Sequence, residues 1–558
     1  MKKFTFICIA ALLVFSLGFG VTYPRNETLY AGGGLWAPPS NWNPITPWAA
    51  VTGVVGLVYE TLYNYDPLTD ELIPWLAEEG KWVSANVYRL TLRKGLTWQD
   101  GKPLTAEDVK FTFELAKKIT SIYYSTIWEW LDTIEVVDAH TLYFKFSDPR
   151  YHEWLYDLYQ IPILPKHIWG RKTEEEVLSG ANEYPVGSGP YSVQTYTQDR
   201  NVYVRNEDWW GTKLLGLKPA PKYIVYLRVL SNNVALGMLI KGELDISNFF
   251  LPGVPSLKRF YGIHTWFEGP PYMLSDNTAF LFLNTTKKPM DDPKFRRALA
   301  FAINPDEIVK KVFEQQVLPS NPLGFLPIKS WMKYYDEKVV EKYGFNYVPE
   351  KAAALLDEAG YKDVDGDGWR EAPDGSEIKL SIIVPYGWTD WMESIKIIAN
   401  AFKAVGLNVT AKFPDYSKYW EDLTAGKFDM AINNFGSQVS ATVWTLYNWL
   451  FNPVTGEYMY NGNFGRYQNE ELDELLRQVN STPLEQEEKT QELLSKIEEI
   501  FLKEMPAIPL WYNGMWFQAS ESVWTNWPSE KNPYAYPVTW GGRWQIGGVM
   551  MLTKLKAK

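Results

Sequence analysis

The chain has 558 residues, of which 46% are hydrophobic and 22% charged, and its formal net charge is −11. This length exceeds what one hydrophobic core usually organises and predicts two or three domains. The acidic balance, without any basic block, argues against binding to nucleic acid or to anionic membranes. Aromatic residues make up 16% of the chain. Both large aromatic cores and a carbohydrate-binding surface are consistent with that content.

The N-terminus has the pattern of a secretory signal. Lys2 and Lys3 precede an apolar stretch over residues 6–15, and small residues suit cleavage after Gly20. The apolar stretch is too short for a stable membrane span. The only cysteine, Cys8, lies inside this signal, so we expect neither disulfides nor a lipid-attachment cysteine in the mature chain. These features predict a free periplasmic protein instead of a lipoprotein.

A first candidate ligand segment follows a predicted strand at residues 27–31. Three glycines at 32–34 lead to Trp36 and two prolines, and then to Trp42 and Asn43. Glycines let the backbone approach a ligand closely, but no Gly-Lys-Ser/Thr follows, so this is not a phosphate-binding loop. The alternatives are a ligand loop and a structural turn with packed tryptophans.

Residues 65–185 are predicted to form a compact α+β segment. Alternating apolar residues indicate strands at 87–92 and 141–146. Thr105, with Asp108 three residues later, has the spacing of a capping box and predicts the start of a helix.

The second half of the chain contains an unbroken β-α-β-α-β pattern. We predict a strand at 378–384, a helix at 391–405, a strand at 407–413, a helix at 416–425 and a strand at 428–433. Such a run packs as a mostly parallel sheet with helices on its faces.

Two polar, aromatic loops follow two strands of this run, after residues 384 and 433. Ligands of open α/β sheets sit outside the carboxyl ends of the strands, so we predict that the loops form one pocket. The alternative is ordinary loops, in which Thr389 caps a helix and the next acid complements the helix dipole. The candidate binding residues in the loops are Tyr386, Trp388, Asp390, Trp391, Asn433, Asn434 and Gln438.

Little in the sequence indicates catalysis, a metal or another cofactor. The four histidines have no metal-site or catalytic-triad spacing. Acidic residues are plentiful, but no glycosidase-type carboxylate pair stands out. Residues 363–374 nominally fit a calcium loop, although Asp374 replaces the usual closing Glu and a strand follows. We predict no metal and no cofactor, with an acidic turn as the simpler explanation of this loop.

Several segments resemble family 5 of the bacterial extracellular solute-binding proteins, which are ABC-importer receptors for peptides, nickel and certain oligosaccharides. The segments are residues 88–95, 98–109, 187–191, 284–303, 358–361 and 426–430. The resemblance implies an α/β, type II periplasmic-binding-protein fold, with two lobes around a cleft and an extra α+β domain inserted in the first lobe. The implied division is a signal peptide at 1–20, a first lobe at 21–64, 186–282 and 510–558, an inserted domain at 65–185, and a second lobe at 283–509.

One departure from the family pattern bears on the ligand. Peptide-binding members generally place an Asp just after the segment that matches residues 428–434, to hold the peptide amino terminus. This chain has no acidic residue between Asp429 and Glu457, and a buried ammonium without a carboxylate is costly. The motifs Gly-Leu-Trp-Ala-Pro-Pro near the N-terminus and Pro-Tyr-Gly-Trp-Thr-Asp-Trp at 385–391 instead resemble the cellobiose- and mannobiose-type members.

We therefore predict a monomeric receptor, and not an enzyme, that binds β-linked gluco- or manno-oligosaccharides and delivers them to a membrane permease. Trp511 and Tyr512, near a predicted hinge, complete the candidate ligand-binding residues. Two other functions remain open, namely oligopeptide binding on the same fold and secreted glycoside hydrolysis.

Overall fold

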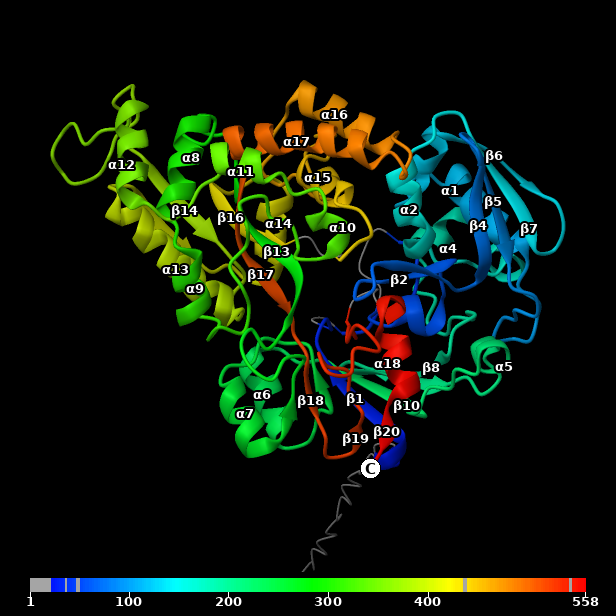
Figure 1. Cartoon of the computed structure of the whole chain (residues 1–558). Helices are drawn as coiled ribbons and strands as arrows, with labels where there is room; N and C mark the ends of the chain where they lie inside the picture. Colours follow the sequence, from blue (N-terminus) through cyan, green and yellow to red (C-terminus); the bar gives the residue numbers. More distant parts are fainter. Residues whose placement is uncertain (1–21, 36–37, 47–50, 435–438, 541–543) are drawn as a thin grey trace, which may run out of the picture.

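The computed structural model describes residues 22–35, 38–46, 51–434, 439–540 and 544–558. Three large sheets, each accompanied by helices, make up the molecule (Figure 1). In this view a seven-stranded sheet lies at the bottom, a five-stranded sheet at the upper left and a four-stranded sheet at the right.

The seven-stranded sheet collects strands from distant parts of the chain. They are β1 (Thr28–Gly32), β8 (Tyr191–Thr197), β9 (Arg200–Arg205), β10 (Tyr223–Leu227), β11 (Ile246–Ser247), β12 (Ile263–His264) and β18 (Gln518–Ser520). Their order is β12-β18-β11-β1-β10-β9-β8. The central strand β1 runs parallel to β10 and β11, and its residues Leu29 and Ala31 are fully buried. The carboxyl ends of β1 and β11 therefore meet at one edge of the sheet.

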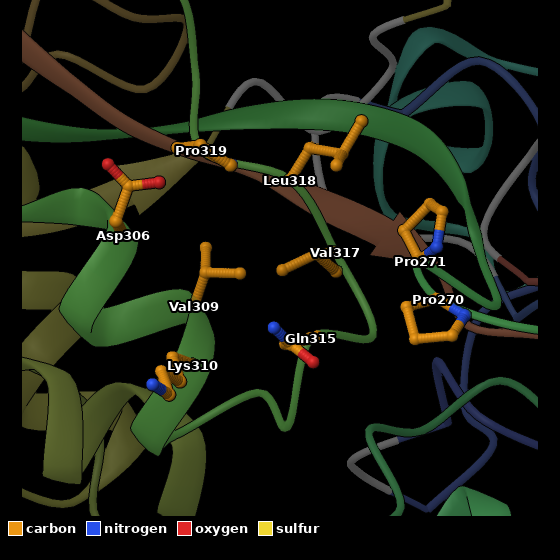
Figure 2. A pocket seen from close by; sticks show the side chains of 9 residues that line it. All are labelled: Pro270, Pro271, Asp306, Val309, Lys310, Gln315, Val317, Leu318 and Pro319. Carbon is orange, nitrogen blue, oxygen red and sulfur yellow. The ribbon is translucent and has the colours of Figure 1, made fainter.

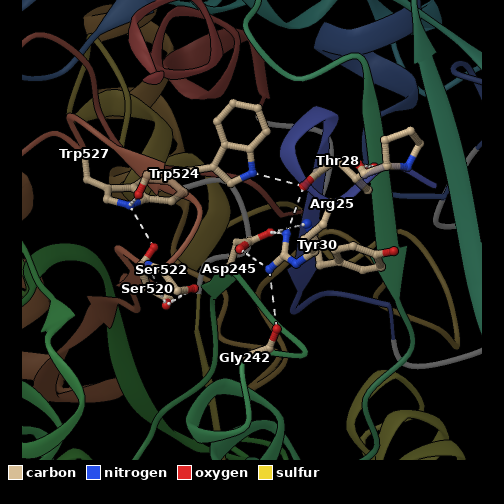
Figure 3. A network of polar contacts seen from close by, with 10 residues as sticks. Arg25, Thr28, Tyr30, Gly242, Asp245, Ser520, Ser522, Trp524 and Trp527 are labelled. Carbon is tan, nitrogen blue, oxygen red and sulfur yellow. Dashed lines mark hydrogen bonds and ion pairs between the residues drawn. The ribbon is translucent and has the colours of Figure 1, made fainter. Parts of the chain in front are cut away.

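An ion pair ties the start of the described chain to this sheet (Figure 3). Arg25 donates to the two carboxylate oxygens of Asp245 at 2.5 and 2.8 Å, and the backbone N–H of Tyr30 donates to the same carboxylate at 2.8 Å. The Asp245 side chain is fully buried, whereas that of Arg25 is 38% exposed. The pair fixes the residue that immediately precedes β11.

The four-stranded sheet is antiparallel and belongs to the segment predicted as α+β. Its strands, in spatial order, are β4 (Ala77–Ser84), β5 (Val87–Leu92), β7 (Thr141–Phe146) and β6 (Leu131–Val136). The strands predicted at 87–92 and 141–146 are confirmed. The predicted capping box is also present, because the backbone N–H of Thr105 donates to the Asp108 carboxylate at 2.9 Å at the start of α1 (Ala106–Lys118).

The five-stranded sheet contains the predicted β-α-β-α-β run. Its strands, in spatial order, are β15 (Asn408–Lys412), β14 (Lys379–Ile383), β16 (Met430–Asn434), β13 (Leu274–Leu283) and β17 (Ala507–Met515). The helices of the run are α13 (Thr389–Ala404) and α14 (Tyr416–Thr424). β14 is parallel to β15 and β16, as predicted. β13, however, is antiparallel to both of its neighbours, so the sheet is mixed.

The antiparallel strands β13 and β17 link the two larger sheets. β13 begins at Leu274, ten residues after β12, and β17 ends at Met515, three residues before β18 starts. Figure 1 shows β17 running from the five-stranded sheet down to the seven-stranded one. β13 and β17 pair along most of their length, so residues from both sheets meet beside them.

Helices cover the sheets and the space between them. They are α2 (Tyr151–Gln160), α3 (Lys166–Trp169), α4 (Glu174–Ser179), α5 (Trp210–Leu215), α6 (Asn232–Ile240), α7 (Val254–Tyr261), α8 (Pro293–Ala302), α9 (Pro305–Lys311), α10 (Lys329–Met332), α11 (Glu337–Tyr343), α12 (Pro349–Glu358), α15 (Trp444–Leu450), α16 (Glu470–Asn480), α17 (Glu487–Glu504) and α18 (Gly548–Lys554). The helix α2 contacts α15 and α16, where the Asn480 amide and Glu153 exchange hydrogen bonds at 2.9 and 3.0 Å. Within the part of the chain that the structure describes, no helix has the length and apolar content to cross a membrane.

Most of the large aromatic content serves the core. At least twelve of the described tryptophans are almost completely buried, among them Trp42 and Trp511. A buried indole contributes a large apolar surface, which supplies stability to a mature chain expected to lack disulfides. Only a minority of the rings therefore remain available for a ligand.

Candidate functional site

A cavity of about 170 Å³ lies where the two larger sheets meet beside β13 and β17. Its lining residues come from the β1 loop, the start of α6, the segment after β11, the start of α13, the strands β13, β16 and β17, the residue just after β17, and the C-terminal segment before α18. They are Gly34, Asn232, Asn248, Phe249, Phe250, Asn277, Trp388, Asp390, Trp391, Asn434, Asn513, Gly514, Trp516 and Trp540. The lining is thus dominated by aromatic rings and neutral amides.

Another hollow, of about 350 Å³, lies between the Pro270–Pro271 turn and α9 (Figure 2). Its other lining side chains are mostly aliphatic, with Asp306, Lys310 and Gln315 as the polar members. No aromatic ring is among its described lining residues. The smaller cavity combines rings with several converging polar groups, as ligand sites commonly do, and is the candidate site.

Two indoles stand at the start of α13. Trp388 is the residue just before the helix and is half-buried, whereas Trp391 in its first turn is only 2% exposed. Their rings meet edge to face, with centroids 4.8 Å apart and an angle of 78°. Trp391 therefore supports Trp388 from the core side, and Trp388 presents more surface to the cavity.

A third indole, Trp516, lies just beyond β17. Its ring stacks on Phe313 at 15° and meets Phe250 edge to face, with centroids 6.1 and 5.3 Å away. A Cβ at Gly514 would come within 2.9 Å of the Trp516 ring, so glycine is needed for the ring to lie against the strand. This close approach holds Trp516 at the cavity wall.

Asp390 is the one acidic residue among the described lining residues. It is buried, and burial raises the pKa of its carboxyl to about 6. Hydrogen bonds from the backbone at the helix start and from Asn232 act in the opposite direction and lower this pKa. The Asn232 amide donates to Asp390 at 3.4 Å and to Thr389 at 3.3 Å. Since Asn232 begins α6 beside the other sheet, this contact joins the two walls of the cavity.

Asn433 and Asn434, predicted to belong to the loop that follows strand 428–433, are divided by the geometry of that strand. Asn433 and Asn434 both lie in β16, and successive strand side chains point to opposite faces. Asn434 lines the cavity. In the pairing with β13, Asn434 lies opposite Ala279 and Asn433 lies opposite Phe280. Asn433 does not line the cavity.

The structure brings together Trp388, Asp390, Trp391 and Asn434 from the predicted set. It places six other predicted residues elsewhere. The Trp42 indole donates to Asn201 at 3.2 Å, and the Asn43 amide donates to the Val177 carbonyl at 2.6 Å. Tyr386 is 70% exposed, and Asn433 occupies the opposite face of its strand. Trp511 is fully buried against Phe313, and the Tyr512 hydroxyl donates to the Phe325 carbonyl at 2.8 Å. Trp36 and Gln438 lie outside the described residues.

The sequence reasoning found the opposite wall of the cavity only in part, because the glycine segment 32–34 was a candidate ligand loop but Asn248 was not singled out. Gly34 and Asn248 follow β1 and β11, which are parallel. The rule that ligands sit at the carboxyl ends of strands, applied to this sheet as well, would have pointed to Asn248. Asn277 and Asn513 lie within antiparallel strands, for which that rule gives no signal.

The acidic loop before β14 differs in detail from the calcium-loop pattern. The carboxylates of Asp363, Asp365 and Glu371 come within 4.8 Å of one another. Asp374, at the nominal closing position, instead accepts hydrogen bonds from Ser376. The loop lies outside the candidate ligand site.

The architecture defines a solute-binding receptor, in which a cavity lies between two α/β lobes joined by crossing strands. Residues 71–457 match the family model described as bacterial extracellular solute-binding proteins, family 5 Middle. The chain belongs to this family, which confirms the predicted resemblance and the periplasmic-binding-protein fold. Members are extracellular or periplasmic receptors of ABC importers and not enzymes, so the hydrolase alternative is set aside.

Curated relatives carry peptide-binding names. The chain is 29% identical to the dipeptide-binding protein of Escherichia coli over 54% of its own length and 58% of that protein. It is 25% identical to the oligopeptide-binding protein AppA of Bacillus subtilis, over 75% of each chain. The first match spans less than two thirds of that relative, so it supports the receptor class more strongly than the ligand.

A solved structure from Thermotoga maritima is much more similar. It is described as a mannohexaose-bound periplasmic oligopeptide-binding protein of an ABC transporter, and it is 59% identical to this chain. The match covers 96% of this chain and all of that one, with a TM-score of 0.92. The nonapeptide complex of AppA from Bacillus subtilis matches at 20% identity and a TM-score of 0.76, which shows the shared fold alone.

Proposed function

We propose that this receptor binds β-linked gluco- or manno-oligosaccharides of the cellobiose or mannobiose type. The chemistry of the cavity lining carries the proposal, since four indoles and five asparagines accompany one carboxylate and no basic side chain among the described lining residues. Indole faces cover the apolar faces of sugar rings. Amides and a carboxylate exchange hydrogen bonds with hydroxyl groups.

The Thermotoga maritima structure supports the sugar ligand. A protein 59% identical to this chain is described as bound to mannohexaose, a chain of six mannose units. The same description calls that protein oligopeptide-binding, and the curated relatives have peptide-binding names. Oligopeptide binding is therefore the second candidate, with Asp390 as the lining residue able to pair with a peptide ammonium.

We propose that the two walls close over the sugar by a hinge motion, as in other periplasmic binding proteins. The contact from Asn232 to Thr389 and Asp390 spans the cavity and would form as the lobes approach. Closure buries the ligand and creates the surface that the membrane permease recognises. The proposed lobe boundaries at 282 and 510 fall within β13 and β17, which would connect the lobes. The proposed inserted domain spans 65–185.

The same proposal includes export and assembly state. Residues 1–20 would act as a signal peptide, cleaved near Gly20, and release the receptor into the periplasm. The receptor would act as a monomer. Mass analysis of the secreted chain tests the cleavage position, and light scattering tests the assembly state.

Titration calorimetry of the mature protein tests the ligand class. The panel contains cellobiose, mannobiose, their longer β-linked oligomers, and di-, tri- and nonapeptides. We expect saturable binding of at least one β-linked sugar and no comparable response to peptides. Tight peptide binding without any response to sugars would overturn the proposal in favour of the second candidate.

A further inference from the structure

Three neighbouring strands present asparagines on one face at the floor of the cavity. Asn513 of β17 lies directly opposite Asn277 of β13, and Asn434 of β16 lies opposite Ala279. Side chains two residues apart on a strand share a face, so Asn277 and Ala279 point the same way. The small Ala279 side chain leaves space between the amides, and all three asparagines line the cavity.

Two oxygens of this amide row have no hydrogen-bond partner. Asn277 is 1% exposed and Asn513 is 9% exposed, yet the side-chain oxygen of each is buried without a donor. An unsatisfied buried oxygen lowers the stability of the fold, and folded proteins retain few of them. Such groups in a ligand cavity are explained when the ligand supplies the missing donors.

The orientation of the Asn277 amide is set by its neighbour. Its Nδ2 donates to the Asp276 carboxylate at 3.1 Å, and that carboxylate also accepts from the Tyr536 hydroxyl at 3.0 Å. A carboxylate oxygen is a hydrogen-bond acceptor, so this contact places the NH₂ group of Asn277 toward Asp276. The Asn277 oxygen is then left without a donor, and turning the amide over would give up the contact with Asp276.

The ligand that fits this row carries neighbouring groups that each donate a hydrogen bond. Directly opposed side chains in an antiparallel pair have Cβ atoms about 4.5–5.5 Å apart, so two acceptors lie within reach of one small ring. Hydroxyl groups donate and accept at once. They can use the Asn277 and Asn513 oxygens and the nearby Asn232 and Asp390 groups together.

We propose that Asn277 and Asn513 are specificity-determining residues that accept hydrogen bonds from neighbouring hydroxyl groups of one sugar ring at the cavity floor. The assignment rests on the proposed sugar-binding function and adds the positions that read the hydroxyl pattern. Trp516, held against the strand at Gly514, covers one side of the same subsite. A site with buried acceptors rejects a ligand that lacks the matching hydroxyl, because the acceptors then remain unpaired.

The test combines Asn513→Leu and Asn277→Leu with deoxy sugars. Leucine has a similar size and removes the acceptor. Calorimetry would use whichever of cellobiose and mannobiose binds the wild-type protein more tightly, together with its mono-deoxy analogues. We expect each variant to bind the parent sugar about tenfold more weakly, in line with the loss of one hydrogen bond. Removal of one particular hydroxyl should weaken wild-type binding but leave binding to the matching variant unchanged.

Thermal melting of the sugar-free protein distinguishes a ligand-binding role from a structural one, because loss of a structural residue would lower the melting temperature. Asn513→Leu should melt at or above the wild-type temperature, since it removes an unpaired oxygen. Asn400→Leu, on the exposed side of α13, is the matched control and should bind normally. If both cavity variants bind as the wild type does, or keep its full deoxy-sugar discrimination, the amide assignment is wrong while sugar binding stands. If the wild-type protein binds peptides and none of the sugars, the proposed function itself fails.

Discussion

Replacement of the two indoles at the start of α13 should have opposite consequences. Trp391 is 2% exposed, whereas Trp388 is half-buried, and the rings meet edge to face at 4.8 Å. Removing an almost fully buried indole typically costs about 3–5 kcal/mol of stability. Trp391→Ala should therefore lower the melting temperature clearly, while Trp388→Ala should lower it much less.

Sugar affinity should depend mainly on Trp388. An aromatic side chain buries about 150–250 Å² in total, and one stacked ring face accounts for less than half of that area. Burial of roughly 80 Å² at about 25 cal/mol per Å² contributes about 2 kcal/mol. Loss of that contribution weakens binding about 30-fold. Trp388→Ala should show this loss in calorimetry with the tightest-binding disaccharide of the panel.

The assay is a pair of measurements on each variant, namely melting without sugar and sugar affinity at a temperature where the variant is folded. Trp128→Ala serves as the control, because Trp128 is also partly buried but packs beside Lys117 in the segment 65–185. The reasoning is refuted if Trp388→Ala keeps wild-type affinity. It is equally refuted if Trp391→Ala loses affinity without any loss of stability.

Three further predictions concern buried charges. Arg25→Ala leaves Asp245 buried and unpaired, so denaturant unfolding should show that the free energy of unfolding falls by about 3 kcal/mol. This is the lower end for a buried pair, because Arg25 is 38% exposed. The control Lys145→Ala, which breaks an exposed pair, should lower the free energy of unfolding by less than about 1 kcal/mol. Burial raises the pKa of Glu60 to about 7, so the stability of the wild type relative to Glu60→Gln should increase as the pH falls from 8 to 5, and a flat difference would contradict this. Burial raises the pKa of Asp390 to about 6, so sugar affinity should weaken between pH 7.5 and 5 in the wild type but not in Asp390→Asn.

The β-α-β-α-β run was predictable because its signals are local. The strands are short apolar segments, and the helices end before Gly406 and Gly426, which adopt the left-handed backbone with φ of 84° and 67°. Glycine favours that conformation at helix ends. The capping box at Thr105 is local in the same sense. Each of these elements lies within two residues of its predicted bounds.

The rest of the fold depends on contacts between distant segments. β13 pairs with β17, which lies more than 200 residues later in the chain, and nothing within either strand specifies its partner. The same limitation explains the tryptophans. Trp511 and Trp516 lie five residues apart, and Phe313 packs against both rings. Only Trp516 lines the cavity, whereas Trp511 is fully buried, and nothing local in the sequence separates the two.

The lining also bears on the choice between sugar and peptide in a way that the sequence argument did not reach. A missing acid after β16 was the reason to disfavour a peptide, yet Asp390 supplies a buried carboxylate at the same cavity. A short peptide also carries a carboxylate at its other end, and this group would meet no basic side chain among the described lining residues. Burying that charge without a partner would be costly, whereas the neutral sugar that we propose would offer donors to the amide oxygens and carry no charge into the cavity.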